Sequence, residues 1–263
     1  MKIKRLLLSL LKVLGIIAFW LAIWALVSFR VNSELLFPSP LSVLKALGTL
    51  AITSKFWLTS LYSLVRVILG ILVSLLLGAA LAVITEKSRI LNSLLSPMLN
   101  VIKATPVASF IILALLWLNR DTLPLFITAL IVVPIVWSNV SEGIRSVDHN
   151  LVEVAKIYKF SAKSKLTKLY VPSVAPFFMA ACRSSLGMAW KAGISAEVLS
   201  TPNNAIGTEL YFAKTYLETP SLFAWTAVVI VLSVIIEKLF VFVLEKVGDK
   251  LHIIPRGVNN DKN

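Results

Sequence analysis

Long blocks of apolar residues, separated by short polar segments, run through the whole chain. Apolar residues within a block do not alternate with polar ones, so the pattern predicts helices rather than the strands of a membrane barrel. About 20 apolar residues cross the ~30 Å hydrocarbon core as a helix. The predicted spans are about 6–29, 57–84, 104–118, 123–140, 176–198 and 222–244. The sequence therefore predicts one all-α integral membrane domain, residues 1–263, with six transmembrane helices.

Two of these boundaries depend on local features. The first span follows the basic start of the chain and looks superficially like a signal peptide. Its apolar stretch exceeds the ~7–15 residues of a signal core and no small-x-small cleavage site follows, so we expect it to be retained. The third span is short unless the amphipathic stretch 91–103, also expected to be helical, enters the membrane with it.

Composition and charge agree with a membrane protein. The chain is 58% hydrophobic and 15% charged, which excludes an ordinary soluble domain. A net charge of +13 would suit a nucleic-acid partner in a soluble protein, but Lys and Arg also collect in the cytoplasmic loops of membrane proteins. Sixteen basic residues fall in the segments assigned to the inside and five outside, which predicts that both termini are cytoplasmic and that nucleic acid is not a partner.

The polar loop 141–175 carries six of those basic residues and is predicted to hold two short helices. Asn150, with Glu153 three residues later, resembles a capping box at the start of the first helix. Apolar residues of this helix share one face: Leu151, Val154, Ala155 and Tyr158. The helix is too short to span a bilayer and suits the membrane surface or a groove on a partner. The lysine-rich second piece, 162–170, would equally suit anionic lipid.

This loop carries a resemblance to a known family. Glu153-Val154-Ala155, then Lys159, then Leu169-Tyr170-Val171-Pro172 keep the spacing of the cytoplasmic signature of permease subunits of binding-protein-dependent ABC importers, in the nitrate, sulfonate and taurine branch. The similarity covers nearly the whole chain. Two positions depart from the signature: Val154 stands at an alanine, and Lys159 stands where the family has a glycine.

The glycine position matters because a left-handed turn between two helices costs other residues roughly 1 kcal/mol or more. Either the turn is remodelled around Phe160 and Ser161, or the first helix continues further.

The resemblance implies a type I ABC importer fold and the partners that go with it. Those partners are cytoplasmic ABC ATPase subunits, an extracytoplasmic solute-binding protein, a second copy of the chain and the lipid of a bacterial inner membrane. The loop would be the coupling helix, with these residues meeting the ATPase: Asn150, Glu153, Val154, Ala155, Tyr158, Lys159, Phe160, Ser161 and Pro172. A capping role for Glu153 alone remains an alternative. ATP and Mg would be bound by the ATPase, because no glycine here precedes the Lys-Ser or Lys-Thr pair of a P-loop.

A candidate substrate path lies on the fifth span. A mixed stripe recurs there at steps of three and four, polar and aromatic except for Gly187 and the apolar Ile194: Arg183, Gly187, Trp190, Ile194 and Glu197, with Lys191 about 80° from Arg183. The alternative is that Arg183 reaches lipid headgroups, Glu197 sits at the outer boundary, and Trp190 and Ile194 only pack. On the second span, Arg66 is expected to extend to the membrane surface. The small residues Gly70, Ser74, Gly78, Ala79 and Ala82 are expected to form a close-packing face.

These features predict an importer subunit without a catalytic or metal site or a cofactor of its own. One Cys and two His residues cannot supply a metal cluster. The expected cargo is a small organic or inorganic anion, such as sulfonate, taurine or nitrate; a vitamin-precursor heterocycle is the alternative. An ion-coupled secondary transporter would also suit charged spans, but no internal repeat is visible. A lipid-modifying enzyme would need a polar cluster richer in His, Asp and Cys.

Overall fold

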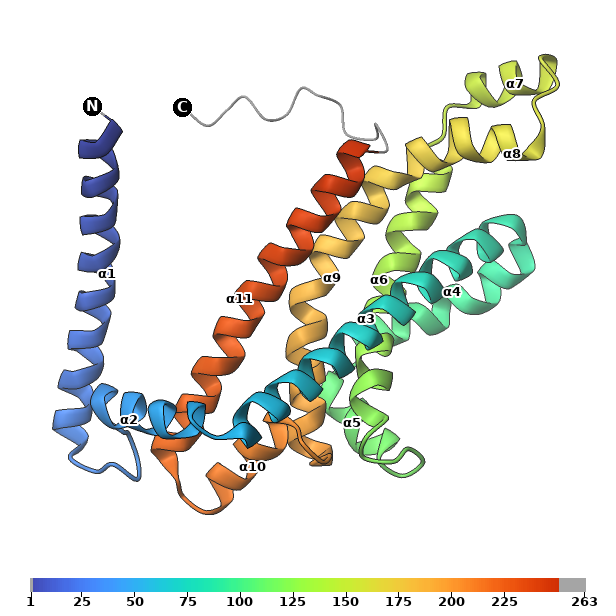
Figure 1. The fold of residues 1–263 in the computed structure, drawn as a ribbon. Coiled ribbons are helices and arrows are strands. Elements are labelled where there is room, and N and C mark those ends of the chain that lie inside the picture. Colours follow the sequence, from blue (N-terminus) through green and yellow to red (C-terminus); the bar gives the residue numbers. More distant parts are fainter. Residues whose placement is uncertain (1, 251–263) are drawn as a thin grey trace.

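The computed structural model describes residues 2–250 as helices joined by short turns (Figure 1). The elements in order are α1 (Lys2–Val31), α2 (Pro40–Ala51), α3 (Ser54–Lys87), α4 (Arg89–Ala104), α5 (Val107–Ala114), α6 (Leu123–Arg145), α7 (His149–Ile157), α8 (Ala162–Lys165), the π-helical turn η1 (Leu166–Tyr170), α9 (Val171–Ser200), α10 (Ile206–Thr215) and α11 (Thr219–Lys250). The described residues include no strand. The predicted tail after α11, residues 251–263, lies outside the described residues.

Several of these helices can cross a bilayer. Within residues 2–250, four are long and apolar enough, in α1, α3, α6 and α11, and the pair α4 and α5 passes the same test as one unit bent by 106°. The predicted all-α membrane fold is confirmed. The 30 residues of α9 could also span, but charged and small residues lower its hydropathy. The count of six spans stays a prediction.

The bend between α4 and α5 has a local cause. Thr105 is extended, with φ −86° and ψ 136°, because the ring of Pro106 disfavours helical geometry in the residue before it. Pro106 also lacks the N–H that would continue the α4 ladder. The predicted helix 91–103 and the third span therefore meet at a sharp corner.

Two boundaries of the predicted polar loop are corrected by the structure. The helix α6 continues past residue 140 to Arg145, so the loop begins later than residue 141. The helix α9 begins at Val171 rather than at Pro176, with Pro172 in its first turn, where proline loses no helical hydrogen bond. Most of the segment 141–175 is therefore helical.

The core of the molecule is formed by α3, α6 and α9, which pack closely through small residues. A Cβ atom added at Gly78 would lie 2.7 Å from the Cβ of Val136, and one added at Gly70 would lie 3.0 Å from the Cβ of Thr128. Both glycines therefore let α3 approach α6 more closely than any other residue would allow. The prediction of a close-packing face on this helix is confirmed.

The helix α1 stands apart from this core (Figure 1). Its apolar side chains are open, with Phe19 61% and Trp20 63% exposed. It is joined to the rest through the α1–α2 turn, where the indole N–H of Trp24 donates to the Pro38 carbonyl at 2.9 Å. In the same turn Glu34 accepts hydrogen bonds from Ser42 and Ser39, which lower the pKa of its carboxyl.

The two ends of the molecule differ in what they carry. In Figure 1, α7 and α8 project from one end, where α1 also begins and α11 finishes. The opposite end carries α2, α10 and the turn between α5 and α6. We call these the α7 end and the α10 end.

Candidate functional site

The helix α7 begins differently from its prediction. Asp148, not Asn150, is the N-cap, since its carboxylate accepts the backbone N–H of Asn150 at 2.8 Å. Glu153 lies 3.5 Å from Nε2 of His149, one turn earlier, and forms no capping box. The capping-box interpretation of Asn150 and Glu153 is therefore wrong, because the sequence offered two candidate caps two residues apart.

The turn at the end of α7 shows how Lys159 is accommodated at the position where the family has a glycine. Lys159 itself adopts the left-handed conformation, with φ 50°. Its N–H bonds the Lys156 carbonyl at 3.0 Å, and the N–H of Phe160 bonds the Ala155 carbonyl at 2.9 Å, which together form a Schellman motif. Neither expected alternative occurs: the turn stays at Lys159, and Ser161 caps α8 by accepting the N–H of Ser164.

Replacing Lys159 with glycine is therefore expected to stabilise the protein. Glycine pays no steric cost at positive φ, so the free energy of unfolding should rise by up to about 1 kcal/mol. Thermal unfolding of the purified protein measures the change, with Lys156→Gly, inside α7, as the matched control that should lose about 1 kcal/mol. A loss at Lys159 as large as at Lys156 would contradict the role of the left-handed turn.

The predicted coupling residues form an open surface at the α7 end. Tyr158 is 73% exposed, and Leu151 and Val154 are about half exposed. The neighbouring Ile157, which the sequence analysis did not single out, is 75% exposed. Of the predicted apolar face, Ala155 is buried. The other predicted residues, Asn150, Glu153, Lys159, Phe160, Ser161 and Pro172, are also exposed. An apolar patch of this kind, on a short helix rimmed by charges, is typical of a docking surface.

The predicted stripe on α9 is not one open face. Trp190 and Ile194 are buried in the core, and the Trp190 indole N–H donates to the Val229 carbonyl of α11 at 3.1 Å, so the packing alternative describes both residues. Gly187 is partly buried. Arg183 and Lys191 are exposed. The open side of α9 instead carries Ser184, Met188, Lys191 and Ser195, at steps of four, three and four residues.

Glu197, the last residue of that stripe, lies at the centre of a buried polar network. Its side chain is fully buried and lies 2.7 Å from Nη1 of Arg66 on α3. Its other oxygen accepts from the Ser63 hydroxyl at 2.7 Å and from the Gly207 N–H at 3.2 Å. The Ser63 hydroxyl in turn accepts the N–H of Ile206 at 2.8 Å.

This network gives Arg66 and Glu197 partners inside the protein that the sequence did not predict. The Arg66 side chain is only 13% exposed, and its guanidinium group also reaches the Asn203 carbonyl at 3.4 Å and Asp121 at 3.9 Å. That Arg66 extends to the membrane surface and that Glu197 sits at the outer boundary stay predictions. A pair 131 residues apart gives no local sequence signal. The absence of a side chain at Gly207 allows this close approach, since an added Cβ there would overlap Glu197 and the Val198 backbone.

Together these features define a class of protein. Apolar helices of spanning length, a tightly packed three-helix core and a short exposed amphipathic helix at one end describe a multi-span membrane protein that presents a docking helix to a partner. Among residues 2–250, no three His, Cys, Asp or Glu side chains lie close enough together to hold a metal ion.

Comparison with known proteins identifies the family. Residues 70–248 match the family described as the binding-protein-dependent transport system inner membrane component, and the chain belongs to it. The chain is 30% identical over 200 residues to SsuC of Escherichia coli K12, named as an aliphatic sulfonates transport permease protein, covering 75% of this chain and 76% of that one.

Two cyanobacterial proteins are also similar. The nitrate import permease protein NrtB of Synechococcus elongatus is 27% identical over 191 residues, 68% of each chain. The bicarbonate transport system permease protein CmpB of the same organism is 26% identical over 217 residues, 75% of this chain and 74% of that one. The prediction of an ABC importer permease of the nitrate and sulfonate branch is confirmed.

Proposed function

We propose that this permease imports a small inorganic or organic anion and is driven through α7 by a separate cytoplasmic ATPase. The observation that carries the proposal is the exposed apolar surface of α7, with Ile157 and Tyr158 about three-quarters open to solvent. Exposing apolar side chains to water on a short helix is unfavourable, and covering them with a groove on a partner lowers the free energy.

The sequence supports a separate ATPase. None of the ten glycines precedes the Lys-Ser or Lys-Thr pair that holds nucleotide phosphates in a P-loop. Nucleotide binding to a partner can shift the permease between conformations only through contacts that differ between them. The α7 surface is suited to make those contacts because it projects from the bundle (Figure 1).

An anionic cargo is supported by charge and by the relatives. Arg183 and Lys191 are exposed on α9, a helix otherwise embedded among apolar spans. Cations on a helix packed among membrane spans attract an anionic solute. The relatives are named for aliphatic sulfonates, nitrate and bicarbonate, all of them anions.

A second copy of the chain would complete the path. The open side of α9 carries Ser184, Lys191 and Ser195, which are too polar to face hydrocarbon. Two copies related by a two-fold axis would bring these surfaces together around a central path. The excess of basic residues on the segments assigned to the inside supports an orientation in a bacterial inner membrane with α7 and both termini on the cytoplasmic side and the α10 end outside.

Reconstituted transport tests the proposal. The permease would be placed in proteoliposomes with the ATPase and the solute-binding protein of the same importer, and uptake of labelled taurine, nitrate and bicarbonate measured with and without internal ATP. We expect uptake of one of these anions only when ATP and the binding protein are present. Uptake driven by an ion gradient without ATP, or ATP hydrolysis by the isolated permease, would overturn the proposal.

A further inference from the structure

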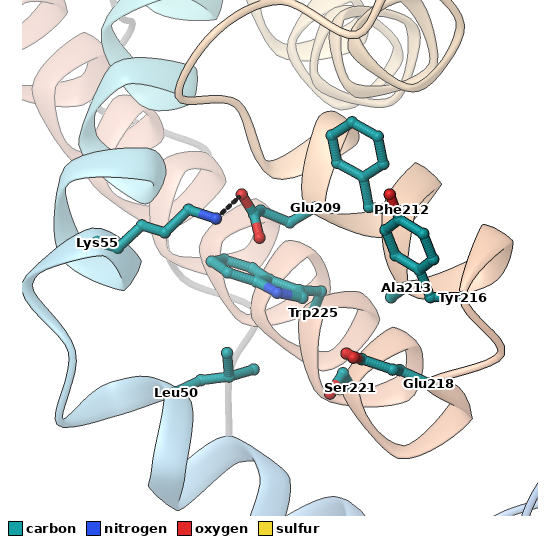
Figure 2. A pocket seen from close by; sticks show the side chains of 9 residues that line it. All are labelled: Leu50, Lys55, Glu209, Phe212, Ala213, Tyr216, Glu218, Ser221 and Trp225. Atoms are coloured by element: carbon teal, nitrogen blue, oxygen red, sulfur yellow. Dashed lines mark ion pairs between the residues drawn. The ribbon is translucent and has the colours of Figure 1, made fainter.

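The α10 end contains a cavity of about 270 Å³ that the proposed transport path does not use. It lies where the end of α2, the start of α3, α10 and the start of α11 meet (Figure 2). The lining residues are Leu50, Lys55, Glu209, Phe212, Ala213, Tyr216, Glu218, Ser221 and Trp225. Its volume is just below the ~300 Å³ at which pockets for drug-sized ligands begin, so it suits one side chain rather than a loop.

The charged residues of the cavity leave one negative charge without a partner. Nζ of Lys55 lies 2.7 Å from Oε1 of Glu209, and this pair occupies one side of the cavity (Figure 2). Glu218 is exposed on the opposite side, and no ion pair or hydrogen bond to its carboxylate is found within the described part of the chain. Two carboxylates therefore face one ammonium group, which favours a cation and repels an anionic cargo.

Aromatic rings provide the remaining walls. The rings of Phe212 and Tyr216 stack with centroids 5.9 Å apart and an interplanar angle of 17°, and Tyr216 remains 68% exposed. Trp225 is 3% exposed and is fixed by the ring of Phe56 at 5.0 Å. Aromatic faces attract cations through their quadrupole, and a carboxylate beside them adds a charge-assisted hydrogen bond.

We propose that this cavity binds a lysine or arginine side chain of the solute-binding protein. The occupant is a protein side chain because the family is binding-protein-dependent and because the cavity lies at the end opposite α7. The bound group would sit between the Tyr216 ring and the Glu218 carboxylate, above Trp225. This inference rests on the proposed function, which supplies the partner and places the α10 end outside.

The test measures how tightly the solute-binding protein of the same importer binds to the permease–ATPase complex. The complex is held in nanodiscs of phosphatidylglycerol, a lipid that carries no amine. Glu218→Gln is expected to weaken binding about tenfold and to reduce its dependence on salt, because one buried charge contact is lost. Tyr216→Ala should weaken binding similarly, and Tyr216→Phe should retain most of it, since the ring supplies the contact. Asp121→Asn, at the same end but outside the cavity, should leave binding unchanged.

Cross-linking identifies the occupant. A photoreactive amino acid at position 216 is expected to cross-link a peptide of the binding protein that contains Lys or Arg. In nanodiscs that contain phosphatidylethanolamine, a cross-link to that lipid instead would overturn the proposal, as would wild-type affinity in Glu218→Gln.

The two hypotheses fail in different ways. If the binding protein stimulates ATP hydrolysis by the wild-type complex but Glu218→Gln changes nothing, only the inference about the cavity fails. If the wild-type complex neither binds nor responds to the binding protein, the proposed function is wrong, and the inference about the cavity is wrong with it.

Discussion

Replacing Arg66 with alanine is expected to lower the free energy of unfolding by about 3–5 kcal/mol, because it leaves Glu197 buried without a counter-charge. Glu197 is fully buried, and its nearest cation is the Arg66 guanidinium at 2.7 Å. Ser63 and Gly207 also donate to the carboxylate, but neutral donors cannot offset the cost of burying its charge. Thermal and denaturant unfolding of the purified permease in one detergent would measure the loss.

The matched control is the ion pair between Arg145 and Glu86. It has the same shortest distance, 2.7 Å, but the Arg145 side chain is 53% exposed. Arg145→Ala should therefore cost about 0–1 kcal/mol. Equal losses in the two variants would contradict the argument from burial.

A double variant separates the charge from the space it fills. Arg66→Met combined with Glu197→Met removes both charges and keeps similar volume, so it should recover most of the stability lost in Arg66→Ala. A double variant as unstable as the single one would show that packing, rather than an uncompensated charge, is responsible.

The network explains why this ion pair matters to the α10 end. Glu197 is on α9, Arg66 and Ser63 are on α3, and the N–H groups of Ile206 and Gly207 open α10. Because a buried polar network is stable only when all its members are satisfied, loss of one residue should loosen α10 from α9. Hydrogen exchange of α10 would increase in Arg66→Ala.

Replacing both Ile157 and Tyr158 with alanine is expected to abolish coupling to the ATPase while leaving the permease folded. These side chains are 75% and 73% exposed, so truncating them costs the bundle little packing. At an interface, a buried aromatic anchor contributes about 2 kcal/mol or more, which is roughly a thirtyfold loss of affinity. Co-purification of the ATPase and ATP-dependent uptake in proteoliposomes would measure the effect.

Leu239→Ala provides the control for that experiment. Leu239 is 62% exposed on α11, which carries none of the predicted coupling residues, and its truncation should change neither co-purification nor uptake. Full ATPase binding by the Ile157 and Tyr158 double variant would show that α7 is a lipid-associated connector rather than a coupling helix.

The sequence alone was sufficient for the membrane class, the helical architecture and the position of the candidate coupling helix. Continuous apolar blocks, Pro106 between α4 and α5, and glycines such as Gly78 act through local geometry, and local geometry can be read along the chain. The motif spacing from Glu153 to Pro172 was likewise visible. The sequence did not show which residue caps α7, because Asp148 and Asn150 are both good caps. It also did not show which residue forms the turn at the end of α7, because the steric cost of a left-handed Lys159 is offset only by the hydrogen bonds of the Schellman motif.

Only the tertiary structure decided which side of α9 is open and where its charges go. Helical periodicity gives the spacing of Trp190, Ile194 and Glu197 but does not say which face meets α3 and α11. The pairing of Arg66 with Glu197 depends on the approach of two helices 131 residues apart in sequence, and the cavity between Lys55 and Glu218 depends on four elements meeting. Such contacts are set by packing across the whole bundle, and a sequence read one segment at a time does not contain them.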